Sequence, residues 1–272
     1  MEHSFSLEGK VIIITGGTGG LGSSFLDGIV EAGGTVGILG RNRRVAEEMA
    51  SKINRDGGKA VAICADVTKK TDLINAKKLV LDTYGKIDGL INAAESNMTT
   101  EVENNLDIFN MDLNGLKQIM EVNLWGTVLA TQVFGDAIAR HGEGSIVNIS
   151  SVAAQRVIRK IPGYSMAKAS VECFTKWFAV ELGKRHGDAI RINAIVPGFF
   201  SRSNGAMSMK KKKRESDKKQ SVIVDKIPFQ RLGEPEELKG IAVWLMSDAS
   251  KFVTGTTISI DGGFHVDSGL FD

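Results

Sequence analysis

VIIITGGTGGLG, residues 11–22, is the stretch that decides the fold. Its first part, Val11–Ile14, is a short apolar run typical of a buried strand, and a helical pattern over Gly22–Ala32 follows the glycines. Glycines let a ligand approach the backbone closely, and the N-terminus of a helix favours anions. In this strand–turn–helix context we expect a phosphate-binding turn, with glycines spaced GxxxGxG at Gly16, Gly20 and Gly22.

Strand-like apolar runs alternate with helical patterns along the whole chain. Further strands are expected at Thr35–Leu39, Val61–Ala65, Ile87–Asn92, Ser145–Ile149, Ile190–Val196 and Thr257–Ile260. Further helices are expected at Asn42–Arg55, Asp72–Tyr84, Leu113–Arg140, Pro162–Arg185 and Pro235–Met246. This alternation predicts a doubly wound parallel sheet of the Rossmann type, in three α/β/α layers. Because no linker interrupts it, we expect residues 1–272 to form a single domain.

Two polar segments break the alternation. Ala94–Asp112 is rich in asparagine and predicts a long loop. Residues 201–225 include the basic run Lys210–Arg214, and blocks of like charge repel one another and stay solvated. We interpret residues 201–225 as a mobile lid over a ligand crevice, and not as a nucleic-acid signal.

Composition excludes several classes of function. The 272 residues are 42% apolar and 24% charged with a net charge of +2, so no overall field favours nucleic acid or a membrane surface. Cys64 and Cys173 lie in apolar contexts and predict reduced core residues, while the four scattered histidines predict no metal site. No apolar run approaches the roughly 20 residues that span a bilayer, and the start lacks a signal-peptide core. A cytoplasmic enzyme that acts on a small molecule is the natural expectation.

Tyr164 and Lys168 stand four residues apart in a helical pattern, so they share one face. A neighbouring ammonium favours the phenolate and predicts a lowered pKa for the tyrosine, which would suit acid–base catalysis near neutral pH. Ser151 follows the apolar run Ile146–Ile149, so its hydroxyl is expected at the mouth of the sheet. Together the three side chains predict a site that moves a proton on and off an oxygen.

The end of the second predicted strand bears on nucleotide preference. Gly40 offers no carboxylate for a ribose 2′-hydroxyl, whereas Arg41 offers a guanidinium for a 2′-phosphate. This favours NADP(H), with NAD(H) as the alternative. Asp66 closes the third strand, where its carboxylate could accept a bond from an adenine amino group or start a helix.

Taken together, these motifs resemble the short-chain dehydrogenase/reductase family over nearly the whole chain. The matching elements are the glycine turn, Asp66-Val67, Asn92-Ala93-Ala94, Asn123, Ser151, Tyr164 with Lys168, Pro197-Gly198 and Asp261-Gly262-Gly263. The resemblance implies hydride transfer between a nicotinamide coenzyme and a carbonyl or alcohol. It implies coenzyme-binding roles for Gly16, Thr18, Gly20, Leu21, Gly22, Arg41, Asn42, Asp66, Val67, Asn92, Ala93, Ala94, Tyr164, Lys168, Pro197 and Gly198.

The same resemblance implies catalytic roles. Tyr164 would be the general acid or base and Ser151 would hydrogen-bond the reacting oxygen. Lys168 would bind the nicotinamide ribose and lower the pKa of the tyrosine, and Asn123 would hold a water that relays protons. The family usually has glycine in place of Glu95, whose carboxylate is expected either to alter coenzyme affinity or to point to solvent. A further implication is a homotetramer or homodimer formed by the two long helices.

Some stretches resemble a narrower group, the short-chain type of D-mannonate oxidoreductase (fructuronate reductase). They include Lys160–Tyr164, Pro197–Phe200, Phe252–Gly255 and Ile91–Ala94 with Asn97. A sugar acid needs a cation for its carboxylate and polar groups for its hydroxyls. The expected substrate residues are Lys160, Asn97, Arg202 and Asn204, with Arg156 and Arg159 as further cations. The alternatives are reduction of a 3-oxoacyl thioester on an acyl carrier protein, and a nucleotide-binding protein without turnover.

Overall fold

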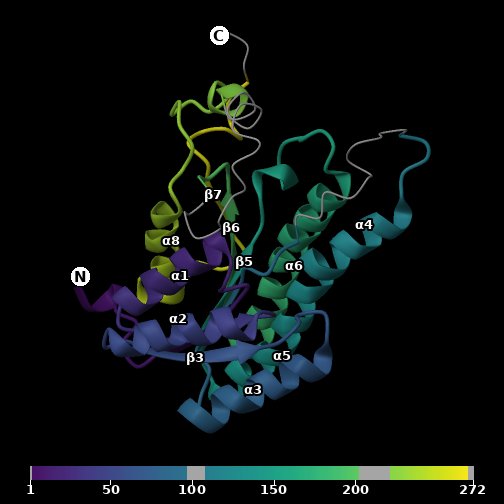
Figure 1. Cartoon of the computed structure of the whole chain (residues 1–272). Coiled ribbons are helices and arrows are strands. Elements are labelled where there is room, and N and C mark those ends of the chain that lie inside the picture. Colours follow the sequence, from purple (N-terminus) through teal and green to yellow (C-terminus); the bar gives the residue numbers. More distant parts are fainter. Residues whose placement is uncertain (1, 97–107, 202–220, 269–272) are drawn as a thin grey trace.

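A single parallel sheet organises the molecule (Figure 1). The computed structural model describes residues 2–96, 108–201 and 221–268. The sheet has seven strands in the order β3-β2-β1-β4-β5-β6-β7. They are β1 (Val11–Thr15), β2 (Thr35–Gly40), β3 (Lys59–Cys64), β4 (Gly89–Asn92), β5 (Gly144–Ile149), β6 (Ile190–Pro197) and β7 (Thr257–Ile260). The order reverses between β1 and β4, which is where doubly wound sheets bind ligands. The predicted Rossmann-type fold in one domain is confirmed.

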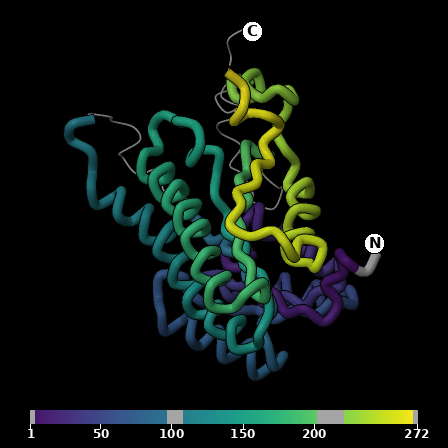
Figure 2. Tube along the Cα trace, turned by 180° about the vertical axis from the view of Figure 1, so that it is seen from behind, coloured from purple at the N-terminus to yellow at the C-terminus, as the bar shows by residue number. Residues whose placement is uncertain are grey.

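Helices cover both faces of the sheet (Figure 1 and Figure 2). One face carries α1 (Gly20–Glu31), α2 (Arg43–Arg55) and α8 (Lys239–Met246). The other carries α3 (Lys70–Tyr84), α5 (Gly126–His141) and α6 (Pro162–His186), with α4 (Leu113–Met120) packed on α6. Short 3₁₀ turns lie at Glu2–Phe5, Val152–Ala154, Pro235–Leu238 and Asp248–Ser250.

The core is divided by the sheet into two apolar layers. Successive strand side chains point to opposite faces, so Ile13 joins the layer under α3, α5 and α6 while Ile12 and Ile14 join the other. Phe134 of α5 and Phe25 of α1 are both fully buried in their respective layers. This burial on both faces explains why the strands are continuous apolar runs and do not alternate with polar residues.

The predicted single helix Leu113–Arg140 is interrupted. A π-helical segment, Glu121–Trp125, separates α4 from α5. The side-chain amide of Asn123 donates to the Ile119 carbonyl oxygen at 2.9 Å. That carbonyl would otherwise accept the backbone N–H of residue 123, so the side chain competes with the regular helical bond. Sequence periodicity carries no signal for such a local change of hydrogen-bond partner.

The two cysteines are not core residues. Cys64 and Cys173 are free, as expected, but both are exposed. Cys64 is the last residue of β3, an edge strand of the sheet, and Cys173 lies on the outer surface of α6. The prediction from their apolar sequence neighbours, that both cysteines lie in the core, is therefore wrong, because an edge strand and a surface helix each keep one side in solvent.

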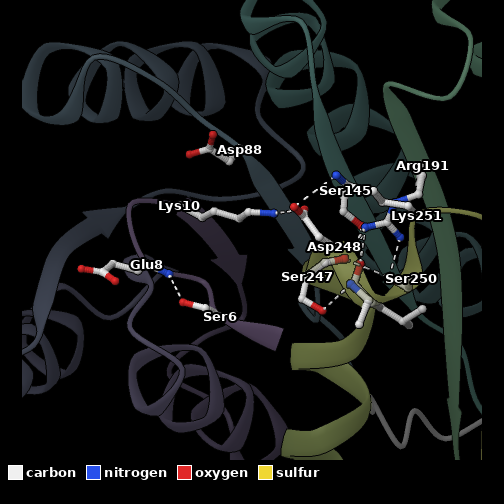
Figure 3. Close-up of polar contacts among 12 residues, drawn as sticks. Ser6, Glu8, Lys10, Asp88, Ser145, Arg191, Ser247, Asp248, Ser250 and Lys251 are labelled. Atoms are coloured by element: carbon white, nitrogen blue, oxygen red, sulfur yellow. Dashed lines mark hydrogen bonds and ion pairs between the residues drawn. The ribbon is translucent and has the colours of Figure 1, made fainter. Parts of the chain in front are cut away.

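A polar network closes the amino end of the sheet (Figure 3). Arg191, near the start of β6, is only 7% exposed. Lys10 pairs with Asp248 at 2.8 Å across the same end. The Arg191 guanidinium donates to three oxygens at 2.8, 2.9 and 3.1 Å, those of Ser250, Leu245 and Ser247.

Candidate active site

The glycine turn packs directly against the end of β4. Gly16 has a φ of +65°, and a Cβ on it would lie 2.6 Å from the Ala93 carbonyl oxygen. A Cβ on Gly22 would collide with the Gly16 carbonyl oxygen. Both positions therefore require glycine, because a side chain would push the turn away from the strand.

A cleft opens beside this turn at the carboxyl ends of β1, β2, β3 and β4. Helix α1 begins there with Gly19 as its N-cap, without a side-chain cap and without an acidic residue in its first turn. Its N-terminal N–H groups thus lack intrahelical acceptors and suit an anion. The residues present therefore fit the pyrophosphate of a dinucleotide. The predicted residues that line the cleft are Gly16, Thr18, Arg41, Asp66, Val67, Ala93 and Ala94, while Gly20, Leu21 and Gly22 form the first turn of α1.

The outer part of the cleft has one cation and one carboxylate. Arg41 is exposed, and a Cβ on Gly40 would lie 2.7 Å from the Thr18 hydroxyl oxygen. Burial tends to raise the pKa of Asp66, but two hydrogen bonds from Thr68, together with Arg41, hold it below its usual value. Asp66 therefore keeps its charge, and no carboxylate follows β2.

Four further predicted coenzyme residues do not line the cleft. Asn92 turns its amide into the interior, where it donates to Thr131 Oγ1 and Asn148 Oδ1, both at 2.9 Å. Asn42 caps α2 by accepting the Val45 N–H at 3.3 Å. Pro197 ends β6, and Gly198 lies against Asp261; neither is among the residues that line the cleft.

Ser151, Tyr164 and Lys168 meet next to the cleft, beside Glu95, which lines it. Ser151 follows β5 and lies near enough to Tyr164, in the first turn of α6, to lower the pKa of the phenol. Lys168 is 2% exposed, its Nζ donates to the Ile149 carbonyl oxygen at 2.9 Å, and it lies 5.3 Å from the centre of the Tyr164 ring. The structure thus brings the predicted serine, tyrosine and lysine together.

Glu95 also reaches this group. The Tyr164 hydroxyl donates to Glu95 Oε2 at 3.1 Å, and Lys168 Nζ lies 3.8 Å from the same oxygen. Burial raises the pKa of Tyr164 and the Glu95 carboxylate raises it further, while Ser151 acts in the opposite direction. Burial also lowers the pKa of Lys168. The expected lowering of the tyrosine pKa is therefore wrong for this arrangement, because burial and, after it, the Glu95 carboxylate both disfavour the phenolate.

Asn123 holds the segment that carries Glu95. It is fully buried, donates to the Ser96 carbonyl oxygen at 3.0 Å and accepts the Ser96 N–H at 3.4 Å. These bonds fix the backbone one residue beyond Glu95. Sequence reasoning missed this contact, and it also missed Glu172, a buried carboxylate one turn beyond Lys168 that accepts from Ser150 at 2.9 Å.

The predicted substrate residues separate into three cases. Lys160 is exposed just before α6 and has a φ of +74°, a conformation that costs a non-glycine residue energy. Arg156 is engaged elsewhere, since it donates to the carbonyl oxygens of His265 and Asp267. Arg159, the other predicted cation, is exposed next to Lys160. Asn97, Arg202 and Asn204 lie outside the described residues, as does most of the predicted lid.

Within residues 2–96, 108–201 and 221–268, no three or more histidine, cysteine or acidic side chains gather in a way that could hold a metal ion. In the same ranges, no helix combines the length and the apolar character needed to cross a membrane.

Comparison with known proteins identifies the family. Residues 17–265 match the family model described as enoyl-(acyl carrier protein) reductase. The chain is 36% identical over 276 residues to an uncharacterized oxidoreductase, UxuB, of Bacillus subtilis, covering 97% of this chain and 98% of the relative. It is 33% identical to a probable 2,4-dienoyl-CoA reductase of the same organism, covering 94% and 97%.

A solved structure is similar over the same extent. A gluconate 5-dehydrogenase from Burkholderia cenocepacia, in complex with NADP and tartrate, superposes with a TM-score of 0.85 at 27% identity and covers 98% of this chain and 99% of that one. The chain therefore belongs to the short-chain dehydrogenase/reductase family. It is an oxidoreductase of the kind that acts on CH–OH groups with a nicotinamide coenzyme.

Proposed function

We propose that the protein interconverts a secondary alcohol and a carbonyl on a sugar acid, of the D-mannonate and D-fructuronate type, with NADP(H). The observation that carries the chemistry is the meeting of Ser151, Tyr164 and Lys168 next to the glycine-turn cleft, where Tyr164 and Lys168 contact its lining residue Glu95. The coenzyme supplies or accepts the hydride when bound. Tyr164 exchanges a proton with the reacting oxygen, Ser151 hydrogen-bonds that oxygen, and Lys168 holds the nicotinamide ribose.

The substrate class rests on charge and on one relative. Lys160 places an exposed ammonium just before the helix that carries Tyr164. Its backbone has a positive φ, and strained conformations of this kind cluster at functional sites. A gluconate 5-dehydrogenase with bound tartrate has the same fold. A coenzyme-coupled screen over sugar acids, neutral ketones and acyl thioesters tests the proposal, with D-mannonate or D-fructuronate expected to turn over fastest.

Lys160→Met sharpens that screen. It should raise KM for a sugar acid about tenfold, the effect of losing one charge-assisted contact, and spare a neutral ketone. The matched control is Lys184→Met, which removes an exposed lysine from the last turn of α6. Equal effects of Lys160→Met on acid and ketone would remove Lys160 from the substrate site.

The coenzyme preference rests on Arg41. It is exposed at the cleft, and no carboxylate follows β2 to repel a 2′-phosphate. NADP(H) should therefore raise the unfolding temperature more than NAD(H) at equal concentration. Stabilisation by NAD(H) alone would refute this preference.

Reduction of an acyl thioester is the second candidate. The description of the matching family model and the similarity to a probable dienoyl-CoA reductase favour it. Faster turnover of a 3-oxoacyl thioester than of any sugar acid would establish it in place of the first. A homotetramer or homodimer in the cytoplasm remains a prediction, for which light scattering measures the assembly.

A further inference from the structure

Glu95 stands between the coenzyme cleft and the catalytic pair. Its side chain lines the cleft together with Gly16, Ala93 and Ala94. From the same position it accepts the Tyr164 hydroxyl at 3.1 Å and lies 3.8 Å from Lys168 Nζ. A molecule that reaches Lys168 from the cleft therefore meets this carboxylate first.

The contact occupies the only proton of the phenol. A tyrosine hydroxyl has one hydrogen to donate, and here Glu95 accepts it. That hydrogen is then unavailable to a substrate carbonyl. The nearby negative charge also disfavours the phenolate, so Tyr164 is equally unsuited to accept a proton from an alcohol. While Glu95 keeps this contact, Tyr164 is hindered both from donating a proton to a carbonyl and from accepting one from an alcohol.

The backbone beside Glu95 is held by hydrogen bonds, whereas its carboxylate is partly exposed to solvent. Asn123 holds Ser96 by two hydrogen bonds, whereas the Glu95 side chain is 32% exposed. The titratable groups facing its carboxylate come from α6, Tyr164 and Lys168. Across the cleft the strand ends present Arg41 and Asp66, and the π-helical segment presents uncharged residues, Val122 and Asn123. The carboxylate can therefore rotate toward solvent without moving the chain.

We propose that Glu95 is a coenzyme-displaced carboxylate: it occupies Tyr164 and Lys168 in the free enzyme and gives up both when coenzyme binds. It thus lowers coenzyme affinity and keeps Tyr164 inactive until the cleft is filled. This inference rests on the proposed use of a nicotinamide coenzyme and assigns a new determinant of its affinity.

Coenzyme binding is the first test. The dissociation constants of NADPH and NADH are measured by coenzyme fluorescence for the wild type, Glu95→Gln and Glu95→Ala. Because the variants remove a charge that competes for Lys168, Glu95→Ala should bind about tenfold more tightly and Glu95→Gln by a smaller factor. Glu121→Ala, which removes an exposed carboxylate from the π-helical segment, should leave binding unchanged.

Tyrosine titration is the second test and needs no turnover. The chain has two tyrosines, Tyr84 and Tyr164, so a Tyr84→Phe background reports Tyr164 alone through tyrosinate absorbance. In that background Glu95→Gln should move the titration of Tyr164 to lower pH. Saturating coenzyme should lower it in the parent and have less effect in the Glu95→Gln variant.

The outcomes separate the possibilities. Unchanged or weaker coenzyme binding by Glu95→Ala would overturn the proposal. So would unchanged binding with a fall in kcat for Glu95→Gln, which would make Glu95 a proton acceptor behind Tyr164. If the wild type and Glu95→Ala both failed to bind either coenzyme, the proposed function would fail, while the titration would still report on the Glu95–Tyr164 contact.

Discussion

The two ends of the sheet differ in how their buried polar groups are paired. At the amino end, the Arg191 guanidinium finds three oxygen acceptors within 3.1 Å (Figure 3). At the carboxyl end, Tyr164 and Lys168 share one oxygen of the Glu95 carboxylate, at 3.1 and 3.8 Å. The guanidinium at the amino end is matched by acceptors of the protein itself, whereas the Glu95 carboxylate is shared by two groups of the proposed active site and stays partly exposed.

Two carboxylates that follow or precede β4 make the difference concrete. Asp88, just before the strand, is 6% exposed at its side chain and accepts the Val11 N–H at 2.7 Å, with Lys86 and His141 within 3.1 Å. Glu95, three residues after the strand, has a side chain that is 32% exposed, and among the described residues its polar partners are Tyr164 and Lys168 of the proposed active site. A fully matched carboxylate stabilises a fold, and an exchangeable one suits a site that changes partners.

Tyr164→Phe should produce the largest effect and confine it to the carboxyl end. Loss of a positioned acid–base group should reduce kcat by about 10²–10⁴-fold. Steady-state kinetics and thermal unfolding should be measured together, with Tyr84→Phe as the control. Undiminished activity of Tyr164→Phe would show that the proton passes through another residue.

Arg191→Met should do the reverse, with a loss of stability and little change in kcat per folded molecule. The buried acceptors at the amino end would lose their donor, which should cost about 2 kcal/mol of unfolding free energy. Denaturant unfolding measures this loss. Arg185→Met, which removes an exposed ion pair with Glu181, should cost less than about 0.5 kcal/mol. Equal costs for the two variants would contradict the contrast between the ends.

Asn123→Ala should have a smaller effect that joins stability to the site. Removing the amide leaves Ser96 without its buried partner and should cost about 1 kcal/mol in denaturant unfolding. It should also release Glu95, so Tyr164 should titrate at lower pH in the Tyr84→Phe background. A lower kcat with an unchanged Tyr164 titration would instead favour the proton-relay role that the family resemblance implies.

Asp248→Asn should give the smallest effect and a pH signature. The hydrogen bond from Lys10 holds the pKa of Asp248 below its usual value, so its contribution is present above the unfolded value of about 3.9 and is lost as pH falls through the folded value. Its side chain is 53% exposed, so the contribution should be at most about 0.5 kcal/mol. The difference in unfolding free energy between wild type and variant should be larger at pH 6 than at pH 3. A constant difference would mean that its charge is unimportant.

Much of the fold followed from local patterns. Each of the seven strands was predicted within two residues of its bounds, because buried parallel strands are continuous apolar runs ended by glycine or polar residues. The glycine turn and the meeting of Ser151, Tyr164 and Lys168 were predicted because the carboxyl ends of parallel strands converge at one edge.

The parts that sequence could not give depend on contacts between distant residues. The partner of Glu95 is set by how the end of β4 meets α6, and the role of Asn123 by a bond to Ser96 across 27 positions. Arg156 looked free in the sequence and is held by the segment near His265. Spacing along one helix or strand predicts which of its side chains lie on the same face. It does not predict which charged residue of another element lies opposite that face.

The π-helical segment also has a consequence for how the chain tolerates change. A wider turn adds a residue to the helix and shifts the phase of everything beyond it by about 100°, one residue's rotation. That shift lets α4 present Leu116 and Ile119 to Gly163 of α6, while α5 presents Phe134 to the sheet. Deleting one residue from this segment would restore a regular helix but would turn the apolar face of α4 or of α5 away from the residues it packs against. Natural variants of this chain should therefore conserve the number of residues in the segment more strictly than the residue types.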